Sequence, residues 1–95
     1  MSTPIIATAL FRMGRIVATP GALEALTPED ILHALGRHSR GDWGDLDDED
    51  RTENDRSLQQ GLRLLSAYRG ADGTRFWIIT EADRGSTTIL LPSEY

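Results

Sequence analysis

The segment from Thr80 to Thr88 carries the densest group of potentially reactive side chains outside one acidic stretch. In this segment Glu81 could act as a base, Arg84 could hold a phosphate, and Thr87, or alternatively Thr88, could donate its hydroxyl to a substrate. His38, which falls at the end of a predicted helix, could join them as an acid. These four residues would suit a metal-independent ribonuclease. The alternative is a polar hairpin loop followed by threonines that favour an extended strand.

The second feature is an acidic stretch, residues 42–56, which holds eight acidic residues and two arginines. Its formal charge is −6, whereas the whole chain carries −5, so the rest of the chain is close to neutral. A charge concentrated in this way can steer a basic partner at short range. We therefore expect a protein partner, and we predict that the following residues bind it: Trp43, Asp47, Asp48, Glu49 and Asp50.

Trp43 lies in a Gly-Asp-Trp-Gly loop, and two interpretations of its role stay open. Its side chain is either an exposed aromatic for recognition or an anchor that holds the loop against the sheet.

Composition argues against several other classes of function. The chain has no cysteine, and His33 and His38 are five residues apart rather than three or four. The acidic stretch also lacks the glycine and final glutamate of a calcium loop, so we predict no metal and no cofactor. The negative net charge argues against direct binding of nucleic acid.

The apolar segments are of strand size, which predicts no membrane span. The mildly apolar N-terminus has no preceding basic residue and is not typical of a secretory signal. We therefore expect a cytoplasmic protein.

Two helices are predicted from their capping residues, and a chain of 95 residues suggests a single domain. Thr27 can cap a helix over residues 28–39, in which Pro28 takes the first position. Asp47 or Asp48 can cap a second helix over about 48–60 that ends at Gly61. A short helical turn is expected at 22–26.

The last third of the chain predicts strands. The segments 62–68, 74–80 and 87–91 are separated by short turns, which indicates a three-stranded antiparallel meander. An N-terminal strand is expected within 9–18, with a break at Gly14. The predicted fold is therefore α+β, with two to three helices packed on one face of the sheet.

The chain resembles a group of short bacterial proteins encoded on plasmids and integrative elements, some of which are labelled as type I restriction subunits. The resemblance covers nearly the whole chain and lies in residues 16–23, His38, 41–44, 61–68, 77–84 and 87–95. It implies a setting in mobile-element biology rather than an activity.

Three hypotheses about function follow from these patterns. The first is a non-enzymatic interaction protein of mobile elements, such as an acidic inhibitor of a host defence protein or of a protein that binds nucleic acid. The second is the ribonuclease, because helices followed by a meander are similar in arrangement to RelE-like and barnase-like enzymes. The third is a homodimer that pairs through an exposed edge of the meander.

Overall fold

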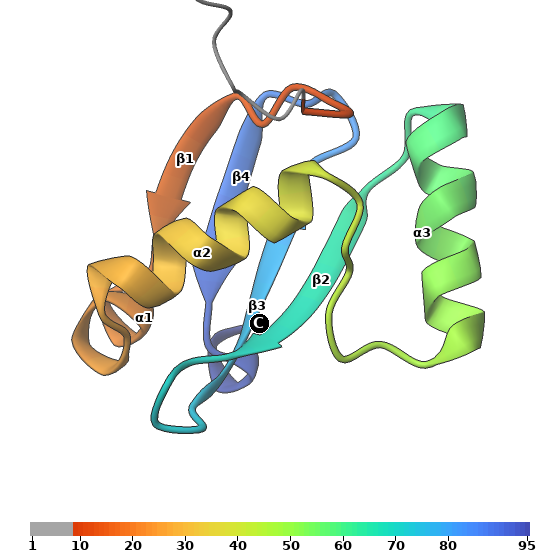
Figure 1. Ribbon diagram of the computed structural model, residues 1–95. Helices are drawn as coiled ribbons and strands as arrows, with labels where there is room; N and C mark the ends of the chain where they lie inside the picture. The colour runs from red at the N-terminus through yellow and green to blue at the C-terminus, as the bar shows by residue number, and fades with distance from the viewer. Residues whose placement is uncertain (1–8) are drawn as a thin grey trace, which may run out of the picture.

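The computed structural model describes residues 9–95, which form an α+β fold with a mixed four-stranded sheet and three α-helices within that range (Figure 1). The elements follow the chain in this order: β1 (Arg15–Ala18), α1 (Pro20–Ala25), α2 (Pro28–Ser39), α3 (Asp48–Gln60), β2 (Leu64–Arg69), β3 (Arg75–Thr80), β4 (Ser86–Leu90) and a short 3-10 helix, η1 (Pro92–Glu94). The expectation about a secretory signal concerns residues that lie outside the described range.

The sheet has the strand order β1-β4-β3-β2. Strand β3 is antiparallel to both β2 and β4, as the turns between these strands predicted. Strand β1 adds to the outer side of β4 in parallel, with Ile16 opposite Thr87. The prediction was a three-stranded antiparallel meander plus an N-terminal strand, whereas the structure has one mixed sheet of four strands in which β1 extends the three antiparallel strands. The N-terminal strand is also shorter than expected, since β1 begins only after Gly14.

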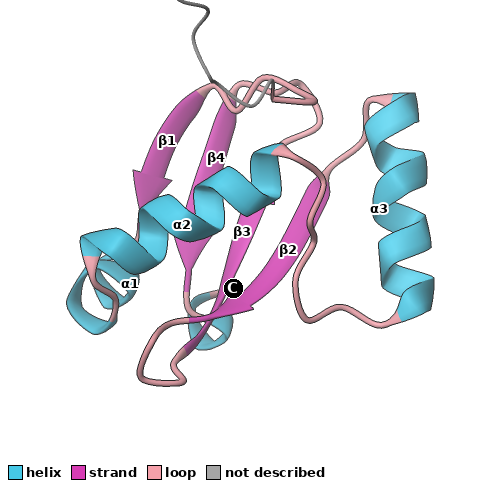
Figure 2. Cartoon of the chain, viewed as in Figure 1, coloured by secondary structure: helices cyan, strands magenta, loops and turns pink. Residues whose placement is uncertain are grey.

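Helix α2 crosses one face of the sheet, and the main core lies between them (Figure 2). The predicted bounds of α2, residues 28–39, are confirmed. A capping box between Thr27 and Asp30 explains why the helix begins at Pro28. Its buried side turns Ala34 and Leu35 toward the inward-facing residues of the strands, among them Ile78. Burial of these side chains is the main stabilising term of this layer.

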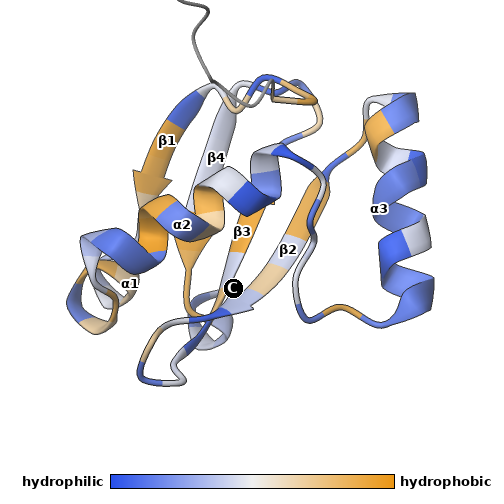
Figure 3. Ribbon diagram, viewed as in Figure 1, coloured by the Kyte–Doolittle hydropathy of each residue, from blue (hydrophilic) through white to orange (hydrophobic). Residues whose placement is uncertain are grey.

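Helix α3 has the predicted bounds but not the predicted place. It stands beside the edge of β2 rather than on the face that α2 covers (Figure 1). Its sequence explains this position, because the helix is hydrophilic over almost its whole surface (Figure 3). A helix without an apolar stripe has little to bury against the face of a sheet. The expectation that two to three helices pack on one face of the sheet therefore does not extend to α3.

Candidate functional site

The acidic surface lies at the start of α3. Asp47 caps the helix by accepting a hydrogen bond from the backbone N–H of Asp50 at 2.8 Å. Asp48, Glu49 and Asp50 form the first turn, where the helix dipole favours negative charge. All four of these residues are exposed. Within residues 9–95, none of these carboxylates lies within 4.0 Å of a basic group. The four predicted acidic residues thus lie together and present free charge to solvent.

Polar contacts hold α3 against the body. The side chain of the buried Asn54 donates to the carbonyl of Leu65 in β2 and accepts from the same residue's N–H at 3.2 Å. Asn54 therefore pairs with the edge of β2 as another strand would. Arg51 also donates to the carbonyl of Gly44 at 3.0 Å. Because these anchors are on one side of α3, the acids of its first turn remain on the outside.

Arg84 fixes the other end of α3. Its guanidinium donates to the carbonyls of Leu62, Glu81 and Ser57 at 2.6, 3.1 and 3.3 Å. A positive charge beside the last carbonyls of a helix also interacts favourably with the negative end of the helix dipole. Arg84 itself has a φ of 60°, which is uncommon for a residue other than glycine. Its donors are thus used inside the fold, and the arginine predicted to hold a phosphate stabilises α3 instead.

Trp43 is an anchor and not an exposed recognition residue. Its side chain is buried, with 4% of its surface exposed. Its indole N–H donates to Asp55 of α3 at 3.0 Å, and its ring packs against Phe11 and His38. Of the two interpretations of Trp43, the anchor that holds its loop in place is therefore the right one. The predicted direct contact of Trp43 with a partner is not supported.

His38 belongs to a closed network of buried hydroxyl groups. The network runs from Ser66 through the two ring nitrogens of His38 to Thr80, then to Thr87 at 2.7 Å and finally to the carbonyl of Met13 at 2.7 Å. A carbonyl oxygen can only accept, so the Thr87 hydroxyl donates to Met13, and Thr80 must donate to Thr87. His38 therefore donates to Thr80 from Nε2. Burial favours the neutral imidazole ring, and in that form Nδ1 accepts from the Ser66 hydroxyl.

Burial, and to a smaller extent the nearby charge of Arg84, lowers the pKa of His38 to about 4. At neutral pH the ring has no extra proton to give, and it is fully shielded from solvent. Neither property suits a general acid that must reach a substrate.

The lowered pKa of His38 predicts a specific loss of stability in acid. Because the folded pKa lies below the ordinary value of 6.5, the unfolded chain binds the proton more readily. The free energy of unfolding is therefore not reduced by His38 above about pH 6.5, and it decreases by about 3 kcal/mol as the pH falls to about 4. A His38→Gln variant should lack this decrease. Urea unfolding at several pH values would measure it, and parallel pH profiles for the two proteins would contradict the network.

The remaining predicted catalytic residues lie in different surroundings. Thr87 is buried and joins the network of His38 through Thr80. Glu81 is partly exposed and pairs with Arg63, with 3.4 Å between the guanidinium Nε and the carboxylate. The structure therefore connects His38 with Thr87 but does not place Glu81 among them. This geometry gives the ribonuclease hypothesis no support.

Sequence reasoning missed the partners that hold these residues, chiefly Asn54, Ser66 and Thr80. One signal was present for Ser66, because it occupies an inward position between Leu64 and Tyr68 in the alternating pattern of β2. A polar residue on such a face needs a buried partner. The partner itself, His38, lies 28 residues away and could not be read from local pattern.

Comparisons of the chain with protein-family models, with curated proteins and with solved structures find no match. Within the described range, no helix is long and apolar enough to cross a membrane. Among residues 9–95, no group of three or more histidine or carboxylate side chains is placed to hold a metal ion.

Proposed function

We propose that this protein is a non-enzymatic interaction protein of a mobile genetic element, and that the first turn of α3 binds a basic surface of another protein. A partner that normally binds nucleic acid would suit this site, because the exposed carboxylates would take the place of phosphates. The observation that carries the proposal is the set of four exposed carboxylates at residues 47–50, none of which pairs with a basic group within residues 9–95.

The way α3 is mounted supports this proposal. A surface for a charged partner works best on a rigid element whose charges are already in position. Asn54 and Arg84 fix the middle and the end of α3 to the body, so little order has to be gained on binding. The field of such a surface acts mainly on the rate of association and on the choice of partner.

The edges of the three C-terminal strands are covered, which weakens the homodimer hypothesis. One side of this group is paired with β1. On the other side, Asn54 binds Leu65, while Ala67 accepts from the N–H of Asp45 and donates to the carbonyl of Trp43. Covered backbone groups cannot pair with a second copy of the chain.

The proposal is tested by competition with DNA. The probe is a labelled 18-residue peptide in which arginine and lysine alternate with serine, bound to a short DNA duplex. The protein should displace the duplex from this peptide. A variant with Asp47→Asn, Asp48→Asn, Glu49→Gln and Asp50→Asn should need about tenfold more protein for the same displacement, since each exposed contact contributes roughly 0.2–1 kcal/mol. Asparagine at position 47 still caps the helix.

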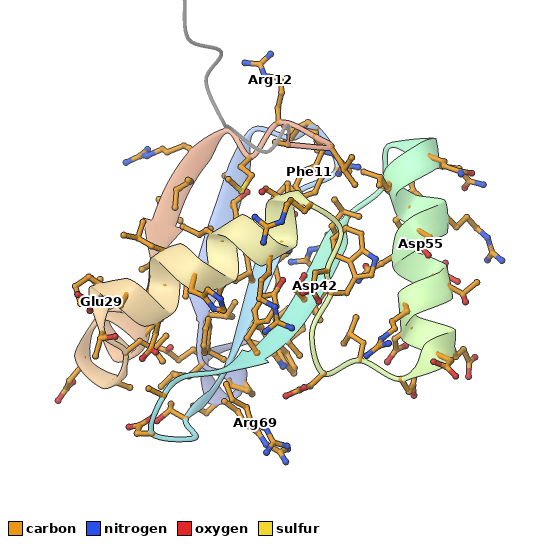
Figure 4. The ribbon with its side chains drawn as sticks, viewed as in Figure 1. Phe11, Arg12, Glu29, Asp42, Asp55 and Arg69 are labelled. Atoms are coloured by element: carbon orange, nitrogen blue, oxygen red, sulfur yellow. The ribbon has the colours of Figure 1, made fainter. Side chains whose placement is uncertain are left out.

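The control for this experiment removes charge elsewhere. Glu24 and Glu29 are both exposed, and Glu29 lies in the first turn of α2, as the acidic residues lie in that of α3. Figure 4 shows Glu29 on the opposite side of the view from Asp55 of α3. The Glu24→Gln, Glu29→Gln variant should displace the duplex almost as well as the wild-type protein. Equal displacement by the wild type and the α3 variant would overturn the proposal.

A further inference from the structure

A groove lies between α3 and the face of the sheet that α2 does not cover. It has a volume of about 380 Å³ and is lined by Leu46, Asp50, Glu53, Asn54, Leu65 and Trp77. Leu65 and Trp77 share this face because the strands alternate, with the buried Ser66 and Ile78 on the α2 side. A second hollow of about 250 Å³ shares Leu46 and Trp77 with the α3 groove and is also lined by Asp45, Arg69 and Arg75.

The floor of the α3 groove is apolar and only partly covered. Leu46, Leu65 and Trp77 all retain partial exposure. Tyr95 contacts the Trp77 ring edge-on at 5.5 Å and closes one side of it. The two buried residues of α3, Asn54 and Ser57, are polar, and its one apolar residue, Leu58, does not line the groove. Grouped apolar side chains on an open sheet face are a feature of interaction sites.

The wall of the α3 groove is acidic. Asp50 and Glu53 line it from α3. Within residues 9–95 Asp50 has no basic partner, and Glu53 pairs only with Arg56 in a contact that is exposed on both sides. Such exposed pairs contribute little and exchange readily for another partner. An apolar floor beside an acidic wall matches a ligand that presents an apolar side chain next to a positive charge.

We infer that the α3 groove receives a basic amphipathic segment of the partner protein. One leucine or aromatic side chain of the segment contacts Leu65 and Trp77, and neighbouring arginine or lysine residues pair with Asp50 and Glu53. This inference rests on the proposed function, because it names the kind of partner segment that the acidic surface binds. It adds that recognition is partly hydrophobic, whereas charge alone would not distinguish one basic segment from another.

Two peptides of equal charge test the inference. The first is the serine-containing peptide used for competition with DNA. The second is the same peptide with every second serine replaced by leucine, so that a leucine occurs at every fourth position. The wild-type protein should bind the leucine peptide at least about tenfold more tightly, because burying a leucine side chain is strongly favourable. The resonance of the Trp77 indole N–H should shift with the leucine peptide and much less with the serine peptide.

Two variants act on the floor of the groove without touching its charges. Leu65→Thr keeps a residue that favours strands in β2, and Leu46→Ser changes a residue of a loop. If one of these variants folds poorly, binding can still be measured with the other. Both should lose the preference for the leucine peptide and keep the affinity for the serine peptide. Removal of residues 1–8 should leave both affinities unchanged. If this removal tightened binding, the groove would belong to the chain's own N-terminal segment, and the inference would be wrong.

The outcomes separate the two claims. If both peptides bind equally well, and the variants bind as the wild type does, the groove inference fails while the acidic surface stands. If neither peptide binds, the proposed function fails as well.

Discussion

A Gly44→Ala variant is expected to lose more than about 3 kcal/mol of its free energy of unfolding. Gly44 forms an isolated bridge with Ala67 of β2 and has a φ of 76°. An added Cβ would lie 1.9 Å from the carbonyl oxygen of Ala67, which is part of the backbone and cannot move aside. The loop would have to leave β2, and it would take with it the hydrogen bonds of Trp43 and Asp45 to Ala67.

Gly61 provides a matched control for this prediction. It has a φ of 70°, but no atom lies within 4 Å of the position of an added Cβ. Gly61→Ala should therefore cost only the conformational strain, about 1–2 kcal/mol. Urea unfolding of both variants gives the comparison. Equal losses would mean that the loop does not lie against β2 as described, and the placement of α3 beyond this loop would be in doubt.

Reversal of charge at the start of α3 is expected to have the largest effect on binding. Asp48→Lys together with Glu49→Lys replaces two exposed attractive groups with repulsive ones. We expect the affinity for a basic peptide to fall on the order of a hundredfold, since attraction is lost and repulsion is added at the same contacts. Asp47 remains as the helix cap, so α3 should still form.

The corresponding change elsewhere separates a local effect from a change in net charge. Glu24→Lys with Glu29→Lys alters the total charge by the same amount on α1 and α2. Charges more than about 8 Å from a contact are largely screened at physiological salt, so this variant should lose only a few-fold in affinity. Circular dichroism should show intact helices in both variants. A similar loss of affinity in both would mean that the whole protein, and not α3, attracts the peptide.

The helices could be predicted from the sequence because the residues that begin and end them are local. Thr27 and Asp47 cap α2 and α3, and both pairs of bounds are confirmed. The place of α3 could not be predicted in the same way. It depends on hydrogen bonds from Asn54 to β2, eleven residues further on, and from Arg84, 27 residues from Ser57. No periodic pattern reports such contacts.

The candidate site shows the same division. The exposure of the acidic residues at 47–50 follows from their polarity and was predictable. The burial of Trp43 was left open, because it depends on Phe11 and Asp55, which come from two other segments. His38 was grouped with the reactive residues only because it falls at the end of a predicted helix. Its neutral state follows from burial, and its hydrogen-bond partner Thr80 lies 42 residues away, so neither could be recognised before the sheet is assembled.

The most direct test of the central claim is the salt dependence of binding to the basic serine peptide. Fluorescence anisotropy would measure the affinity of the wild-type protein and of the variant neutralised at residues 47–50 over a wide range of sodium chloride concentrations. Charges on an exposed surface are screened by salt. We predict that the wild-type affinity falls steeply with salt and that the variant shows both weaker binding and a clearly smaller slope. An affinity that does not change with salt, or the same slope in both proteins, would contradict binding through the acidic start of α3.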